Sequence, residues 1–253
     1  MDLGTRAPLS KTICGDLVLE DMGIVVERVH DEPPAARPDT VDVPGRHGTI
    51  LREITYDSRT IMLECRAFEK RWEDFETLRD TLVTYLMTGE EMKLIVRTHP
   101  DEYYMAYLNT FTEGDRIGGT GIGYFELEFV ASSPWRYGDE HSVQIPSGGS
   151  ATFLVNGNLP AKATVEAAAA VRSSGSTVWG VRFDEGDFAH IATGSSSSRK
   201  VVIDGINRSA TIADAVAMIT LDSNWPVLLP GRHTVRMDEG TGAATLTWQE
   251  RSL

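Results

Sequence analysis

The chain has 253 residues, of which 41% are hydrophobic and 24% charged, and its formal net charge is −13. This composition is ordinary for folded proteins and excludes a disordered or fibrous chain. No apolar run approaches the roughly 20 residues that cross a bilayer, and residues 1–23 lack a basic segment followed by an apolar one. We therefore expect the protein to be made in the cytoplasm and not to insert into a membrane. The two cysteines, Cys14 and Cys65, are too few for a disulfide framework and are expected to be buried.

Two neighbouring segments early in the chain predict a β-hairpin. Residues 61–67 alternate between apolar and polar types, as a half-buried strand does. Its buried face is expected to hold Ile61, Leu63, Cys65 and Ala67. Residues 50–56 alternate more weakly, and the short stretch 57–59 separates the two segments. We therefore expect these strands to pair with each other.

The next segment, residues 71–87, predicts a helix. Its apolar side chains recur at three- and four-residue spacing, acidic side chains crowd its first turns, and Gly89 ends it. Three strands are expected to follow, at 93–97, 103–108 and 124–130. The inward-facing residues of the last one are expected to be Phe125, Leu127 and Phe129. The first half of the chain thus predicts a sheet covered by one helix.

A change of composition marks the expected domain boundary. Residues 146–150 are turn-forming, and they separate a charge-rich part from one dominated by Ala, Ser, Thr and Val. We therefore expect domains at 1–145 and 146–253. The first holds 15 Lys and Arg against 27 Asp and Glu, a net charge of −12, and the second holds 9 against 10, a net charge of −1. This excess of acid argues against adhesion to nucleic acid or to anionic membranes.

The second part of the chain predicts a β-sandwich or jelly roll. Short apolar runs recur there with turn signals between them, and the Ala-rich stretch 165–171 is interpreted as strand and not as helix. Asp204 and Gly205 form a strong hairpin-turn signal. The strands are expected at 152–155, 163–167, 177–183, 200–204, 217–221, 233–237 and 244–248.

Motifs for catalysis or cofactor binding are not readable in the sequence. The six histidines are scattered singly, so no spacing places two of them on one metal ion. The glycine cluster 118–123 lacks the lysine and the following helix of a phosphate-binding loop, and is expected to be a loop or hairpin tip. A nucleophile elbow is absent as well. We therefore expect a protein that is not an enzyme and that needs no cofactor and no metal.

The order of these parts resembles a known family. Residues 43–48 and 52–61, then the helix, then the Tyr-rich stretch 101–108 and the closing strand with its proline turn, 125–137, follow the N-terminal domain of phage distal tail proteins (Dit). Residues 156–161, 202–205 and 225–231 resemble that family's C-terminal galectin-like or carbohydrate-module-like sandwich. The single motifs are weak, and the specificity lies in their order over about 230 residues.

The resemblance implies a mainly β fold and a structural role in the virion of a long-tailed phage. Such a protein forms a ring, usually a hexamer, at the tail tip, and links the tail tube protein to the tail-tip hub protein. The C-terminal sandwiches would dock other baseplate proteins, possible partners being the tape measure and receptor-binding proteins. DNA would only pass through the channel, and an acidic first domain would repel it there. The same charge is equally well explained by solubility.

Two sets of residues are candidates for binding. The first is a possible inter-subunit loop, which could also be a surface turn: Val43, Pro44, Gly45, Arg46, His47 and Gly48. The second belongs to an alternative function, a carbohydrate-binding protein whose sandwich stacks sugar on aromatic rings: Trp179, Trp225 and Trp248. Packing in the core or at a hinge is the competing interpretation of these tryptophans. A cell-wall hydrolase is a third possibility, which no catalytic residues support.

Overall fold

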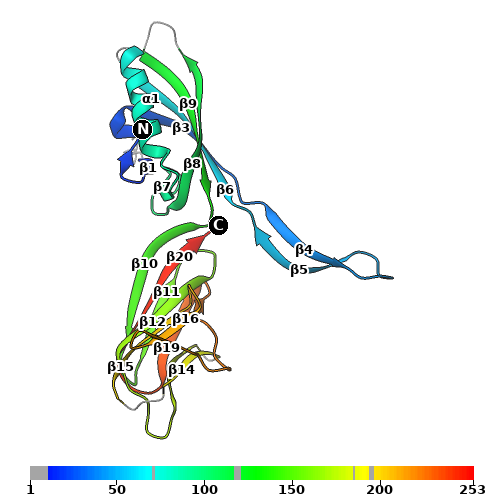
Figure 1. The fold of residues 1–253 in the computed structure, drawn as a ribbon, viewed down its shortest axis with the longest axis vertical. Helices are drawn as coiled ribbons and strands as arrows, with labels where there is room; N and C mark the ends of the chain where they lie inside the picture. The colour runs from blue at the N-terminus through cyan, green and yellow to red at the C-terminus, as the bar shows by residue number, and fades with distance from the viewer. Residues whose placement is uncertain (1–10, 70–71, 117–120, 185, 194–196) are drawn as a thin grey trace, which may run out of the picture. The chain divides into compact units, whose positions relative to one another are not determined.

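The computed structural model describes residues 11–69, 72–116, 121–184, 186–193 and 197–253, and it divides into two compact units (Figure 1). The first unit comprises residues 1–136 together with Leu253, and the second comprises residues 137–252. Nearly all regular structure in both is strand, and one α-helix, α1 (Trp72–Leu86), lies in the first unit. The expected mainly β fold with one helix in the N-terminal domain is confirmed.

The first unit is built on a seven-stranded sheet with the order β2-β1-β7-β8-β9-β6-β3. Helix α1 packs against β6, β8 and β9. A single 3-10 turn, Glu20–Met22, precedes β3. The strands of this sheet are β1 (Ile13–Cys14), β2 (Leu17–Val18), β3 (Ile24–Asp31), β6 (Arg59–Glu69), β7 (Met92–Ile95), β8 (Tyr104–Arg116) and β9 (Gly121–Ala131).

Apolar and polar side chains alternate along β6 and β9, and the apolar ones form much of the core of the first unit. The inward-facing residues predicted for both strands are at most 2% exposed, because each side chain that faces α1 is covered by it or by a neighbouring strand. Both cysteines are buried too, at 0% and 2% exposure, as predicted. Burial, together with the nearby charge of Glu20, raises the pKa of Cys14 to about 12, so this thiol stays protonated at neutral pH.

The expected pairing of residues 50–56 with residues 61–67 is wrong. Strand β6 pairs with β3 on one side and with β9 on the other, so both of its edges are taken. Strand β5 (Thr49–Tyr56) pairs instead with β4 (Ala36–Asp42), which the sequence did not predict. The physical reason is burial: every residue of β5 is exposed, so this strand cannot lie in a sheet that packs on a core.

The second unit is a sandwich of two sheets. One runs β10-β20-β12-β15-β16-β17, with β18 paired to β12, and the other runs β11-β19-β13-β14. The Ala-rich stretch is strand β12, as predicted, because its small side chains alternate into the core. The strands are β10 (Arg136–Ile145), β11 (Ser150–Val155), β12 (Ala161–Ala170), β13 (Val178–Phe183), β14 (Asp187–Ala192), β15 (Arg199–Asp204), β16 (Ser209–Ile212), β17 (Ala215–Ala217), β18 (Val227–Leu228), β19 (Gly231–Glu239) and β20 (Ala244–Ser252).

The two units meet in the sequence between Arg136 and Tyr137, nine residues before the expected boundary at 145/146. Strand β10 accounts for the difference, because it pairs with β20 and sends Ile145 into the core of the second unit. The turn-rich stretch 146–150 connects two strands of the sandwich and is not a linker. Part of the glycine cluster, residues 118–120, lies outside the described residues, and Gly121 and Gly123 belong to β9.

Gly123 tests how α1 is held on the sheet. A Cβ atom at this position would come within 2.3 Å of the Phe75 ring, which is 2% exposed and cannot move aside. We expect Gly123→Ala to destabilise the first unit by about 1–3 kcal/mol, as overpacked cores do, measured by urea unfolding of the full chain. Gly186→Ala is the control, since open space surrounds that glycine. Equal stability of the two variants would contradict this packing.

Candidate functional site

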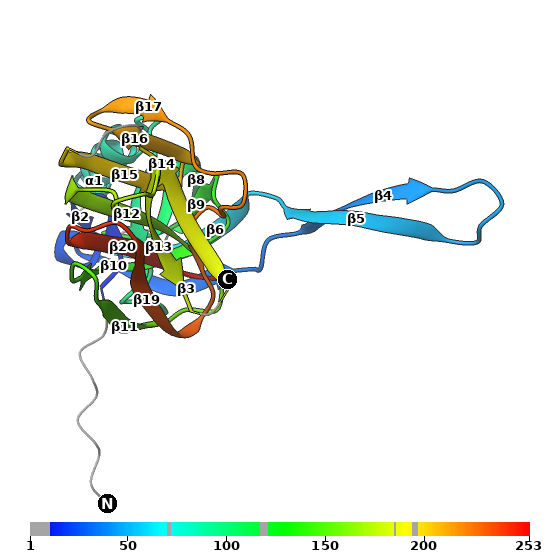
Figure 2. The ribbon, with the colours of Figure 1, turned by 90° about the horizontal axis from the view of Figure 1, so that it is seen from below.

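The first unit contains a long β-hairpin that takes no part in its hydrophobic core. We call residues 36–56 the arm: strands β4 and β5, which pair with each other, joined by residues 43–48, the tip. All residues of both strands are exposed, and Figure 2 shows the arm extending as a two-stranded ribbon. A lone two-stranded hairpin is marginally stable in water, so a ribbon of this kind is expected to serve contacts outside its own chain.

The tip is a tight turn that contains the predicted inter-subunit loop. The Arg46 amide donates a hydrogen bond to the Val43 carbonyl at 3.1 Å. Gly45 and Gly48 have φ angles of 81° and 78°, a left-handed conformation that glycine adopts without strain. The structure thus places the predicted loop at the end of the arm, where its side chains are exposed.

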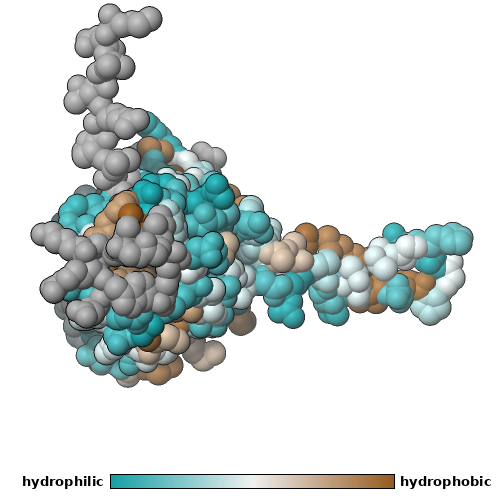
Figure 3. Space-filling model, turned by 90° about the horizontal axis from the view of Figure 1, so that it is seen from above, coloured by the Kyte–Doolittle hydropathy of each residue, from teal (hydrophilic) through white to brown (hydrophobic). Residues whose placement is uncertain are grey.

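The arm is apolar on different faces along its length. Cross-strand partners share a face of the ribbon. Near the root of the arm, where β4 begins and β5 ends, one face carries Ile54 and Tyr56 together with their partners Pro38 and Ala36. These two large side chains are 47% and 43% exposed. A bulge between Asp39 and Thr40 then shifts the register. Beyond it, Val41 and Ile50 pair on the opposite face next to the tip, while Leu51, paired with Thr40, stays on the first face. Figure 3 shows apolar residues along the arm.

An ion pair closes the root of the arm. Asp31 ends β3, Arg59 begins β6, and the Arg59 Nε atom donates to an Asp31 carboxylate oxygen at 2.7 Å. The two side chains are 10% and 3% exposed, so the pair is shielded from water. The Tyr104 hydroxyl donates to the other carboxylate oxygen at 2.7 Å, and Arg59 also donates to the Pro134 carbonyl. Buried charges need such partners, and here each has them.

A second arginine extends this network. Arg136 donates to Glu102 at 2.7 Å and to the carbonyl of Leu253, and lies 3.7 Å from Asp31. Burial opposes the charge of Arg136, but hydrogen bonds to Tyr104 and Glu102 outweigh this effect and raise its pKa. Burial and the hydrogen bond to Asp31 raise the pKa of Tyr104. Burial and the positive charge of Arg136 lower the pKa of His99, which borders the network.

The three tryptophans of the alternative function are not brought together. Trp179 is 0% exposed and donates its Nε1 hydrogen to the Thr241 carbonyl at 3.2 Å, and Trp248 is 4% exposed against Phe153. Neither offers a free ring face. Trp225 is half-buried and lines a pocket of about 340 Å³, together with Asn224 and Asp187, whose side chains are hydrogen-bonded at 2.9 Å.

The described residues contain no group of three or more His, Cys, Asp or Glu side chains placed to hold a metal ion. Within the same part of the chain, no helix is long and apolar enough to cross a membrane. The candidate surface that the structure offers is the exposed arm. The sequence missed β4 and the root network, because Asp31 and Arg59 lie 28 positions apart and neither belongs to a local motif.

Comparison with known proteins agrees with this description. Residues 14–131 match the family model for the phage tail protein RIFT-related domain, and residues 156–251 match that for the siphovirus-type tail component, C-terminal domain. A search of curated proteins found no match. The crystal structure of the Dit (gp 19.1) protein of phage SPP1 superimposes with a TM-score of 0.75 at 16% identity, covering 96% of this chain and 99% of that one.

A chain of the phage P2 baseplate, in its activated conformation with Ca, aligns with a TM-score of 0.46 at 10% identity, over 92% of both chains. The two matched domains together define a siphovirus tail component. With both domains in this order and the fold shared with SPP1 Dit, the chain belongs to the family of siphophage distal tail proteins. It is thus a structural component of the phage virion.

The root ion pair can be tested by removing one partner. Arg59→Ala removes the cation that is hydrogen-bonded to the buried Asp31 carboxylate and leaves it only Arg136, at 3.7 Å, and we expect a loss of about 3–5 kcal/mol in unfolding free energy. Limited proteolysis should also cut the arm faster. Arg37→Ala is the control, since Arg37 pairs with Asp57 at 3.2 Å in an exposed setting worth at most about 1 kcal/mol. Similar losses in both variants would argue against a special role of the root.

Proposed function

We propose that this chain forms a ring at the end of the tail tube, with six copies as the expected number, and that the ring joins the tube protein to the tail-tip hub protein. The observation that carries the proposal is the arm: an exposed ribbon with apolar residues on both faces, which beyond its base, where Tyr56 contacts Trp135, has no partner in the described part of its own chain. A neighbouring subunit would supply that partner and cover the apolar side chains.

The charge of the first unit suits a channel through which DNA passes. The net charge of residues 1–145 is −12, and a wall rich in carboxylates repels phosphate where a basic wall would bind it. We infer that acidic residues of the first unit face the channel and that DNA is in contact with the ring only in transit. The protein would be made in the host cytoplasm and then built into the virion.

The second unit is proposed as a docking module for peripheral baseplate proteins, among which the tape measure and receptor-binding proteins are candidates. It exposes apolar side chains to an unusual degree: Val216 is 91% exposed and Met218 80%. Both lie at or next to β17, the edge strand of its sheet. Exposed apolar residues beside an edge strand are typical of protein contacts.

The alternative function, binding of host-surface glycans by the sandwich, now depends on Trp225. This side chain lines a pocket with Asn224 and Asp187, and an aromatic face beside an amide and a carboxylate is a combination that suits a sugar. If this function operates, a glycan array should show binding that Trp225→Ala abolishes and that the exposed-residue control Leu221→Ala retains. Absence of binding by the unmodified protein would exclude it.

The ring proposal predicts that shortening the arm prevents assembly. Replacing residues 43–48 with Asn-Gly keeps a hairpin turn between β4 and β5 but removes the tip. We expect light scattering to give the mass of a ring for the unmodified protein and of smaller species for this variant. Circular dichroism and urea unfolding control for the fold. A variant that still forms full rings would exclude the tip as a contact, and a basic or neutral channel in electron microscopy would exclude the acidic lining.

A further inference from the structure

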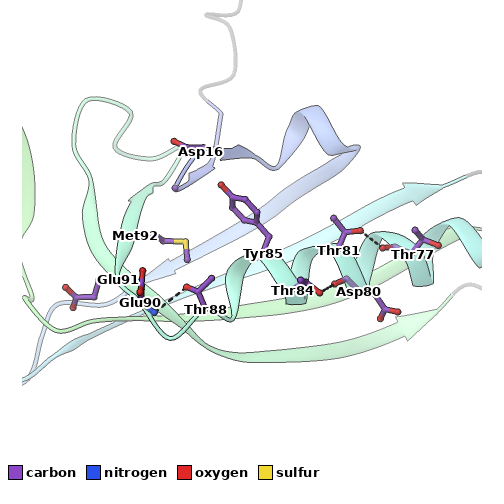
Figure 4. A pocket seen from close by; sticks show the side chains of 11 residues that line it. Asp16, Thr77, Asp80, Thr81, Thr84, Tyr85, Thr88, Glu90, Glu91 and Met92 are labelled. Atoms are coloured by element: carbon purple, nitrogen blue, oxygen red, sulfur yellow. Dashed lines mark hydrogen bonds between the residues drawn. The ribbon is translucent and has the colours of Figure 1, made fainter.

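A groove beside α1 has no assigned role. It lies in the first unit, has a volume of about 790 Å³, and runs between α1 and the turn joining β1 to β2 (Figure 4). Its lining combines an apolar floor with hydroxyl and carboxylate groups. The residues that matter below are Asp16, Tyr85, Met92, Glu90 and Glu91.

The groove is electronegative. Its lining holds four acidic residues and no Lys or Arg. One of them, Asp80, is neutralised by Arg79 at 2.8 Å. For Asp16, Glu90 and Glu91, no ion pair is present within the described part of the chain. The carboxyl end of α1, with no basic residue in its last turn, adds the negative end of the helix dipole at Glu90. Such a surface suits a cation with apolar neighbours.

The tip of the arm has the complementary character. It carries Arg46 and His47, and no ion pair to either exists among the residues that the structure describes. Val43 and Pro44 lie in the same turn, and Val41 and Ile50 lie just behind it. The guanidinium group would meet the carboxylates while the apolar residues cover the floor of the groove.

We propose that the tip of each arm docks into the groove beside α1 of a neighbouring copy of this chain. The contact is between copies, because the arm extends away from the sheet on which α1 packs and its tip lies far from the groove of its own chain (Figure 1). Strand β4 alone spans roughly 23 Å at a strand's usual rise, so the arm can reach well beyond its own sheet. The proposal rests on the ring proposed above and names the acceptor surface within it.

A charge exchange tests this contact. Arg46→Glu and Glu91→Lys are each expected to weaken assembly about tenfold, because each places like charges together. The double variant Arg46→Glu/Glu91→Lys restores opposite charges and is expected to return to within about threefold of the unmodified protein. The matched control is Arg52→Glu combined with Glu91→Lys: Arg52 lies on β5 outside the tip, so no recovery is expected. Assembly is measured by analytical ultracentrifugation.

A cysteine pair provides an independent readout. Pro44→Cys and Thr84→Cys in one chain place a thiol on the tip and one in the groove, while the native Cys14 and Cys65 are buried. Under oxidation we expect a ladder of covalent multimers, and none from either single variant. Rings without cross-links and without charge rescue would overturn the groove contact and leave the ring intact. A protein that stays monomeric at high concentration would overturn both proposals.

Discussion

The arm depends on the ion pair between Asp31 and Arg59. A free two-stranded ribbon would be marginal in water, yet here both of its ends are fixed at one point of a packed sheet. Strand β3 leaves the sheet at Asp31, and β6 re-enters it at Arg59. The hydroxyl of Tyr104 donates a hydrogen bond to the second carboxylate oxygen, and these partners offset the cost of burying the charge of Asp31. An edge-to-face contact between Tyr56 and Trp135 adds packing at the same place.

Much of the fold could be predicted from the sequence where one face of an element is buried. Strands β6 and β9 alternate strictly because one of their faces meets α1, and the helix shows its own apolar spacing for the same reason. The arm has no buried face, so β4 left no periodic signal. The pairing of β5 with β6 was inferred from their closeness in the sequence. This inference fails because β5 belongs to the arm, which leaves the sheet that contains β6. The expected boundary at 145/146 follows β10, which looks in the sequence like the end of one domain and in the structure pairs with β20 of the second unit.

The candidate site was predictable in part. The loop at the tip was identified through its likeness to a family, and its place at the end of an exposed ribbon required the structure. The groove proposed to receive it could not be predicted, because Asp16 and Glu91 lie 75 positions apart in the sequence and meet only through folding. The tryptophans show the opposite limit. Sequence type alone did not distinguish Trp179, which fills the core, from Trp225, which lines a pocket.

The one-residue bulge in the arm, where Arg52 is the extra residue opposite Asp39 and Thr40, decides which face of the ribbon Ile50 occupies. Without this extra residue, strict alternation along β5 would place Ile50 on the same face as Ile54 and Tyr56. With it, Ile50 lies beside Val41 on the opposite face, so the ribbon carries one apolar group near its base and another, facing the other way, near its tip. A ribbon that buries apolar residues on both faces is harder to separate from its neighbours than one that buries a single face.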